Sequence, residues 1–279
     1  MGLCGPSRKH ARHQHEWNVY RSRRSAVGGG RVFAPAVVKA QGANPAANVK
    51  ALLFDVFGTV VDWRNSVARE SEKVLKPLGH NLNWLEFASA WRAEYQPGMD
   101  AIRVRGEPFV KLDIIHRRML DKIRPRFGLQ GLDEATMVEL NLAWHRLDMW
   151  PDAKTGFPRL QKKFMLCPCS NGNIAIMVGI ARHNGMQWDA ILGSEIAQGY
   201  KPQPKVYLLS AEAINLKPEQ CMMTAAHSND LAAAAKQGLR TGHVGRPGEG
   251  GPGTGEDGPR TQVDVAAKNF NEFADKMGA

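Results

Sequence analysis

The sequence predicts an α/β protein whose core is a doubly wound, mainly parallel sheet, with a helical cap inserted after the first strand. Three observations predict this fold class. A short apolar run at residues 49–54 ends at Asp55, helix-forming blocks fill residues 64–150, and from residue 151 apolar runs alternate with helical segments. Because strands that alternate with helices form crossover units, the sheet they build is mainly parallel.

The first strand is predicted at residues 49–54, where Lys50 is the only polar residue. A nearly continuous apolar run of this length is typical of a strand that is buried on both faces of a parallel sheet. The run ends at Asp55, so a carboxylate stands directly after the first strand.

Residues 64–150 predict a helical cap. Four blocks combine helical periodicity with helix-forming residues, at residues 66–77, 84–95, 109–123 and 133–147. Gly and Pro separate these blocks, at residues 77–79, 97–98, 106–108 and 128.

From Pro151 onward, strands and helices alternate. Strands are predicted at residues 164–167, 190–192, 221–226, 241–244 and 263–265, and helices at residues 174–184, 205–214, 230–237 and 270–277. Residues 245–259 are so rich in Gly and Pro that we predict a surface loop and assign it no function. We therefore expect a leader (residues 1–48), a core domain (residues 49–63 and 151–279) and the helical cap (residues 64–150).

The composition is that of a soluble globular protein. Of the 279 residues, 43 % are hydrophobic and 23 % are charged. No apolar run reaches the roughly 18 residues that a membrane span requires. The four cysteines show neither a CxxC motif nor metal-ligand spacing, which favours a reducing compartment. We expect a cytoplasmic protein that binds no membrane and no metal.

The net charge of +10 is concentrated near the N-terminus. Residues 1–50 hold nine Lys or Arg and one acid, Glu16, whereas the other 229 residues hold 28 and 26. Residues 1–48 lack apolar periodicity, so we expect them to be poorly ordered. Their composition fits an organellar transit peptide, a basic leader or mis-chosen start codon, or a nucleic-acid arm. The nearly neutral remainder predicts no nucleic-acid partner.

Polar residues stand at the ends of the predicted strands. Asp55 ends the first strand, Ser170 and Asn171 follow the second, Lys201 follows the third, and Asp230 follows the fourth. Ligands of open parallel sheets bind beyond the carboxyl ends of the strands, so these side chains are expected to converge. Two carboxylates, a lysine and a hydroxyl at one edge predict a nucleophilic site in which Lys201 keeps Asp55 ionised.

Four motifs in this order carry a family resemblance: Asp55-Val-Phe-Gly-Thr, Ser170-Asn-Gly, Tyr200-Lys-Pro and the late Asp230. With the intervening cap, residues 49 to about 245 resemble the haloacid dehalogenase superfamily, and specifically the L-2-haloacid dehalogenases. The resemblance implies a Rossmann-like core with a helical cap and hydrolytic removal of halide from short 2-haloalkanoic acids. It also implies a small-molecule substrate, no cofactor and, as is frequent in that family, a homodimer.

Phe57 separates two chemistries of this superfamily. Phosphatases of the superfamily carry a second Asp two residues after the nucleophile, and this Asp protonates the leaving alkoxide. Phe57 cannot donate a proton, but a halide leaves without one and needs only stabilisation of its charge. Mg²⁺, which shields the nucleophile from a phosphate dianion, is also unnecessary for a monoanionic haloacid. The motif therefore favours a metal-free carbon–halogen hydrolase.

The resemblance implies a role for each motif residue. Asp55 attacks the halogen-bearing carbon with inversion and forms an ester, whose carboxyl carbon is then attacked by water. Lys201 positions and ionises Asp55, and Asp230 orients Lys201 or helps to activate the water. Thr59 and Ser170 donate hydrogen bonds around the nucleophile and the substrate carboxylate.

The halide is expected to bind between Asn171 and the cap residue Arg92, whose charge would stabilise the departing ion. Arg64 and Arg103 are alternatives to Arg92, because the cap varies in length within the family. Tyr207 is expected near the substrate and the nucleophile.

Several positions depart from the family pattern. Ala225 and His227 stand where well-known members have Ser and Asn, so His227 is either a general base or a residue packed in a turn.

Asp230 is also predicted to be the N-cap of the following helix. Pro168 requires that the second strand has ended by Cys169, because proline cannot donate to a sheet. Cys169 itself is expected to be a buried, inert thiol.

Two other classes of function compete with a dehalogenase. One is another hydrolase of the superfamily, such as a Mg²⁺-dependent phosphatase, which Phe57 disfavours. The other is a non-catalytic binding protein that acts through its basic leader. Retention of Asp55, Lys201 and Asp230 together speaks against this second class.

Overall fold

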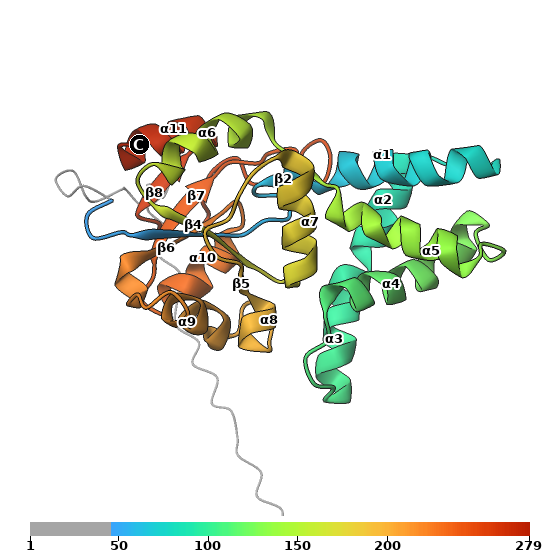
Figure 1. Cartoon of the computed structure of the whole chain (residues 1–279), viewed down its shortest axis with the longest axis horizontal. Coiled ribbons are helices and arrows are strands. Elements are labelled where there is room, and N and C mark those ends of the chain that lie inside the picture. The colour runs from blue at the N-terminus through green and yellow to red at the C-terminus, as the bar shows by residue number, and fades with distance from the viewer. Residues whose placement is uncertain (1–45) are drawn as a thin grey trace, which may run out of the picture. The chain divides into compact units, whose positions relative to one another are not determined.

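The computed structural model describes residues 46–279, apart from the side chains of Arg103 and Val104. Its core is a six-stranded, all-parallel sheet in the order β5-β4-β1-β6-β7-β8 (Figure 1). The strands are β1 (Ala51–Phe54), β4 (Met165–Ser170), β5 (Leu192–Gly193), β6 (Cys221–Ala225), β7 (Arg240–Val244) and β8 (Val265–Ala267). The chain adds β4 and β5 on one side of β1 and then β6, β7 and β8 on the other, which confirms the predicted doubly wound sheet.

Helices cover both faces of this sheet (Figure 1). Side chains of β1 alternate between two hydrophobic clusters: Phe54 belongs to the cluster with Phe157 and Phe270, and Leu53 to the cluster with Val206. Burial on both faces explains why the β1 sequence is continuously apolar. The helices of the core are α6 (Pro151–Gln161), α7 (Ile174–Asn184), α8 (Ser194–Ala197), α9 (Pro204–Glu212), η4 (Pro218–Gln220), α10 (Ser228–Ala235) and α11 (Phe270–Met277).

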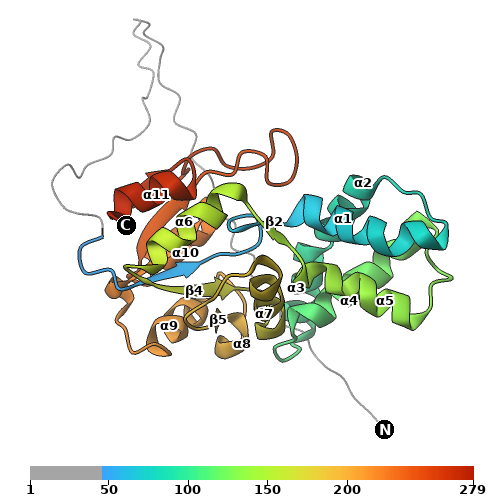
Figure 2. The same ribbon diagram turned by 45° about the horizontal axis from the view of Figure 1, so that its top comes forward.

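A helical insert leaves and rejoins the core through a short antiparallel ribbon, in which β2 (Val61–Asp62) pairs with β3 (Asp148–Met149) (Figure 2). We use "helical insert" for the segment between these two strands. It contains α1 (Trp63–Leu75), η1 (Lys76–Leu78), α2 (Trp84–Ala93), α3 (Tyr95–Arg105), α4 (Leu112–Ile123), η2 (Arg124–Phe127), α5 (Glu134–Asn141) and η3 (Leu142–His145). The side chains of Asp62, Asn83 and Asp133 cap α1, α2 and α5.

The predicted break at Pro97 and Gly98 is wrong, because α3 runs through both residues. Pro97 is the third residue of that helix. The amide groups of the first helical turn have no partner within the helix, so a proline there sacrifices no hydrogen bond.

The prediction that the second strand ends before Cys169 is also wrong, because β4 extends to Ser170 and includes Pro168. The register explains why the proline is tolerated. The Met165 amide donates toward β1, to the Lys50 carbonyl, whereas the Leu166 amide faces the opposite side, toward Asp189. Pro168 shares the orientation of Leu166, and β5 pairs with β4 only from Cys169 onward. The missing amide therefore falls where there is no strand to accept it.

The predictions for the basic leader lie outside the described residues, apart from residues 46–48. Within residues 46–279, no helix is both long and apolar enough to span a membrane.

Candidate active site

Four segments that follow the carboxyl ends of the parallel strands bring the predicted motif residues together. Asp55 follows β1, Asn171 follows β4, Lys201 lies in the segment between α8 and α9, and Asp230 lies in the first turn of α10 after β6. The sequence predicts this convergence because parallel strands end at the same edge of a sheet.

A buried lysine bridges two carboxylates at the centre of the site. Nζ of Lys201 lies 2.8 Å from Oδ1 of Asp55 and 2.5 Å from Oδ2 of Asp230, and each of the three side chains is at most 10 % exposed. The hydroxyl of Tyr207 donates to the other oxygen of Asp230 at 2.6 Å. Burial alone would lower the pKa of Lys201, but the charges of Asp230 and Asp55 outweigh it and raise that pKa well above its usual value. Lys201 is therefore a fixed cation.

The second oxygen of Asp55, Oδ2, accepts two further hydrogen bonds. Thr59 Oγ1 donates at 2.7 Å and His227 Nδ1 lies at 3.0 Å. The Ala226 amide donates to Thr59 Oγ1 at 2.9 Å, which directs the hydroxyl proton toward Asp55. Burial would raise the pKa of Asp55, but Lys201 and His227 outweigh it and hold that pKa far below its usual value. Asp55 is consequently an ionised carboxylate that is largely shielded from water.

His227 pairs with a glutamate that the sequence analysis missed. Its Nε2 lies 2.7 Å from Oε2 of Glu249, and Trp63 of the helical insert donates to Oε1 of the same carboxylate at 3.1 Å. Burial would lower the pKa of His227, but the hydrogen bonds and charges of Asp55 and Glu249 raise it to about 10. His227 therefore carries a proton on both nitrogens at neutral pH, and each proton faces a carboxylate.

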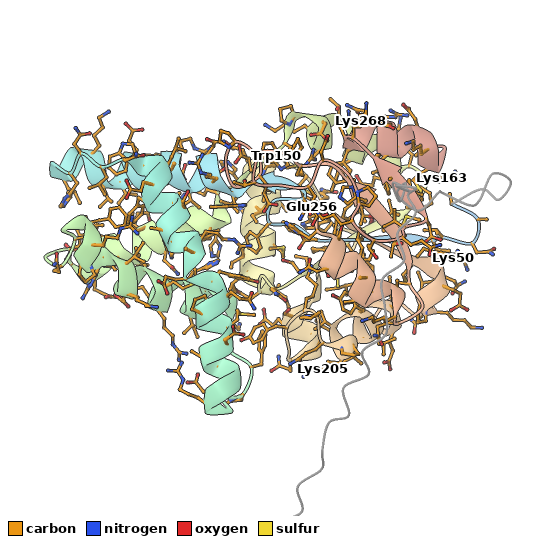
Figure 3. All side chains as sticks on the ribbon, turned by 180° about the vertical axis from the view of Figure 1, so that it is seen from behind. Lys50, Trp150, Lys163, Lys205, Glu256 and Lys268 are labelled. Carbon is orange, nitrogen blue, oxygen red and sulfur yellow. The ribbon has the colours of Figure 1, made fainter. Side chains whose placement is uncertain are left out.

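Glu249 belongs to the Gly- and Pro-rich segment for which the sequence predicted no function. Figure 2 shows this segment, coloured orange-red after β7, extending toward α1. Arg246 anchors it, because its buried guanidinium donates to the Thr59 carbonyl and to Asp152, both at 2.9 Å. Glu256, labelled in Figure 3, holds the other end by accepting from the Ser228 amide at 3.2 Å. The loop is thus a fixed part of the site.

Gly58 of the first motif has a structural reason to be glycine. Its φ is +83°, and a Cβ at this position would lie 1.9 Å from Oε1 of Glu249. The motif glycine therefore leaves room for the glutamate that contacts His227.

Asn171 connects the core to the helical insert. Its Oδ1 accepts from the Lys201 amide and from the Ser194 hydroxyl, both at 2.8 Å. Its Nδ2 donates at 2.8 Å to the hydroxyl of Tyr95, which the sequence analysis also missed. Asn171 is therefore fixed in orientation by donors on one side of its amide and an acceptor on the other.

Arg92 lies among aromatic rings close to this bridge. Its Cζ is 4.0 Å from the ring centroid of Tyr95, 5.7 Å from Trp63 and 6.0 Å from Phe57. Its Nη1 is buried and has no hydrogen-bond partner among the residues that the structure describes. By contrast, the alternative Arg64 donates to Ser89 at 3.0 Å. A buried guanidinium nitrogen without a partner is a ready binding group for an anion.

Phe57 and two residues of the helical insert form an apolar cluster beside Arg92. The ring of Phe57 meets Trp144 and His116 edge to face, at centroid distances of 5.9 and 6.1 Å, and His116 stacks on Trp144 at 4.1 Å. Burial, followed by the charge of Arg92, lowers the pKa of His116 well below its usual value. The position that holds the acid in superfamily phosphatases is thus occupied by a buried phenyl ring next to a neutral imidazole.

Other predicted residues are buried and have no hydrogen bond to Asp55 within residues 46–279. Ser170 Oγ is fully buried and accepts from the Gly172 amide at 3.0 Å, and the fully buried Tyr207 contacts Asp230. The N-cap prediction for Asp230 is wrong, because α10 begins at Ser228 after His227. Burial raises the pKa of the Cys169 thiol to about 11, so this cysteine is protonated at neutral pH.

The site as a whole suits covalent catalysis by a carboxylate. It places an ionised, desolvated Asp55 in contact with Lys201 and with a His–Glu pair, at the carboxyl edge of a doubly wound sheet that carries a helical insert. Residues 46–279 contain no group of three or more His, Cys, Asp or Glu side chains arranged to hold a metal ion. A buried, ionised carboxylate at this edge of a doubly wound sheet with a helical insert is typical of a class of hydrolases.

Comparison with known proteins specifies the family. The family model of the haloacid dehalogenase-like hydrolases matches residues 49–238, and the chain belongs to this family. An (S)-2-haloacid dehalogenase of Xanthobacter autotrophicus is 24 % identical over 202 residues, which cover 71 % of this chain and 76 % of that protein. The crystal structure of a defluorinating L-2-haloacid dehalogenase is 39 % identical with a TM-score of 0.80, covering 83 % of this chain and 96 % of that one. A second L-2-haloacid dehalogenase structure is 37 % identical with a TM-score of 0.77, covering 82 % and 99 %.

Proposed function

We propose that this protein hydrolyses short L-2-haloalkanoic acids, such as haloacetates and 2-halopropionates, to 2-hydroxy acids with inversion. The observation that carries the proposal is that the same site holds an ionised, buried Asp55 and, next to Phe57, an Arg92 whose buried Nη1 has no hydrogen-bond partner among the described residues. Phe57 stands where a phosphatase of the superfamily has its acid. A leaving halide needs stabilisation of its negative charge and needs no proton. The guanidinium of Arg92 can stabilise that charge, and the absence of an acid at Phe57 is no disadvantage. The similarity to two L-2-haloacid dehalogenases at 37–39 % identity supports the same activity.

The first half-reaction uses the groups already in contact. An oxygen of Asp55 attacks C2 of the acid from the side opposite the halogen, so the C–O bond forms as the carbon–halogen bond breaks. The electron pair of that bond leaves with the halide, whose charge is stabilised by Arg92 and by the amide of Asn171. Lys201 and Thr59 hold the carboxylate in place, at 2.8 and 2.7 Å from its two oxygens.

Ester formation also changes the state of His227. In the free enzyme two carboxylates, Asp55 and Glu249, raise the pKa of its imidazole to about 10. The ester of Asp55 is neutral, so one of these two charges disappears and the pKa of His227 falls. Nδ1 can then release its proton, and the imidazole becomes a base just as a water molecule is needed.

The second half-reaction hydrolyses the ester. Water attacks the carboxyl carbon of Asp55, His227 takes the proton, and Glu249 stabilises the imidazolium that forms. The ester C–O bond breaks, the product alkoxide takes the second proton of the attacking water, and the Asp55 carboxylate is restored with one oxygen from that water. Replacement of the family Asn by His227 is therefore a change in the water-activating group within the same two-step reaction.

The test is halide release from L- and D-2-chloropropionate and from haloacetates, with EDTA present. We expect release from the L-acid by the wild type and none by Asp55→Asn. Asp275→Asn is the matched control, because Asp275 is an exposed side chain paired with Arg159 and outside the site. A single turnover in H₂¹⁸O should place the label in Asp55 and not in the product. Mg²⁺-dependent hydrolysis of a phosphate ester without halide release would instead favour a phosphatase.

A further inference from the structure

The hydroxyl oxygen of Tyr95 accepts a hydrogen bond, whereas its proton has no acceptor among the described residues. Two donors, the Lys201 amide and the Ser194 hydroxyl, fix Oδ1 of Asn171, so its NH₂ group must point toward Tyr95. The Tyr95 oxygen thus accepts from Asn171 at 2.8 Å. The described part of the chain provides no acceptor for the proton of Tyr95, which is therefore available to donate to a bound group.

The ring of the same tyrosine lies against Arg92. At 4.0 Å from the Tyr95 centroid, the guanidinium is closer to this ring than to those of Trp63 and Phe57. A cation at this distance is attracted to the ring face and loses freedom to move away from it. Nη1 of Arg92 is buried without a partner in residues 46–279, so this nitrogen and the Tyr95 proton are two unused donors in adjacent groups.

We propose that Tyr95 is a third member of the anion site: its ring positions Arg92, and its hydroxyl, polarised by Asn171, donates directly to the departing halide. This inference rests on the proposed function, because the anion it concerns is the halide product. It adds that the site is completed only when the helical insert lies against the core, since Arg92 and Tyr95 belong to the insert and Asn171 to the core.

Tyr200 provides a matched control. Its hydroxyl also joins core and insert, because it accepts from the Val110 amide at 3.0 Å and donates to the Val110 carbonyl. Within residues 46–279 it makes no hydrogen bond or ring contact with Arg92 or Asn171. Tyr200→Phe therefore loosens the same two parts of the protein without removing a donor from the anion site.

The experiment is titration of the full-length protein with sodium bromide, without substrate, followed by tryptophan fluorescence; Trp63 lies close enough to Arg92 to report on the site. Tyr95→Phe keeps the ring and loses the donor, and it should weaken bromide binding about tenfold, the effect of one lost hydrogen bond. Tyr95→Leu also removes the ring and should weaken binding about threefold more. Tyr200→Phe should bind bromide as the wild type does.

Steady-state kinetics give a second readout that a merely structural role would not move. The constant for product inhibition by halide should rise in parallel with the bromide dissociation constant, and kcat should fall more than KM changes. Bromide binding by Tyr95→Phe equal to that of the wild type, or an equal loss in Tyr200→Phe, would overturn the inference. Failure of the proposed function has a different signature, because the wild type would then release no halide from any haloacid.

Discussion

The two halves of the site differ in how fully their polar groups are paired. On the core side, Lys201, Asp55 and Asp230 satisfy one another through contacts of 2.5 to 2.8 Å. On the side of the helical insert, Arg92 and His116 have buried nitrogens without partners in the described part of the chain. Hydrogen bonds fix the position and charge of a paired group. An unpaired buried donor forms its hydrogen bond only when a ligand binds. This difference supports the proposal that the core half carries the reacting groups and that the insert half binds the halide.

The largest effect is expected from Lys201→Met, which breaks the paired half. Two buried carboxylates would then face each other without a cation, at a cost of about 3 to 5 kcal/mol in the free energy of unfolding. The pKa of Asp55 would rise, and halide release should fall on the order of 10³-fold or more. Urea unfolding and halide release should both show the loss. A variant that loses activity but keeps the stability of the wild type would contradict the view that Lys201 stabilises the fold by neutralising the two buried carboxylates.

Arg92→Met should separate activity from stability, in contrast to Lys201→Met. Halide release should fall roughly 10²-fold or more, because the charge on the leaving halide is no longer stabilised. The free energy of unfolding should stay the same or rise, since the variant removes a buried nitrogen that has no partner within residues 46–279. Denaturation midpoints measured with and without bromide would check this, because bromide should stabilise only the wild type.

The three residues of the paired half were all predicted from the order of the strands, whereas on the insert side only Arg92 was predicted, through the family resemblance. Asp55, Lys201 and Asp230 follow strands of one parallel sheet, so the topology brings them together whatever the details of the loops. Glu249 and Tyr95 could not be found in this way. Glu249 is 22 residues from His227 in a segment whose composition signals only irregular structure, and its position depends on the burial of Arg246. Tyr95 becomes a partner of Asn171 only when the insert meets the core, which no local pattern specifies.

Glu249→Gln should affect the second half-reaction alone. The neutral amide can no longer stabilise the imidazolium of His227, so ester hydrolysis should slow by about 10²-fold. Formation of the ester should continue, because the contacts of Lys201 and Thr59 with Asp55 are unchanged. Rapid-quench measurements should then show a burst of halide equal to the enzyme concentration, with the ester on Asp55 detectable by mass spectrometry. A slow first turnover with no burst would place Glu249 in the alkylation step.

The smallest effect concerns pH and the stability of the free enzyme. The pKa of His227 is raised from its ordinary 6.5 to about 10, so the proton of the folded state is held more tightly than that of the unfolded chain. The resulting stabilisation is fully present below pH 6.5 and is lost as the pH rises toward 10. The Tm advantage of the wild type over His227→Asn should therefore shrink across this range. In Glu249→Gln the same comparison should show a weaker dependence on pH, because only Asp55 then remains to raise the pKa. A Tm advantage that stays constant from pH 6 to 10 would mean that His227 is neutral between its two carboxylates, and that it can act as a base before the ester forms.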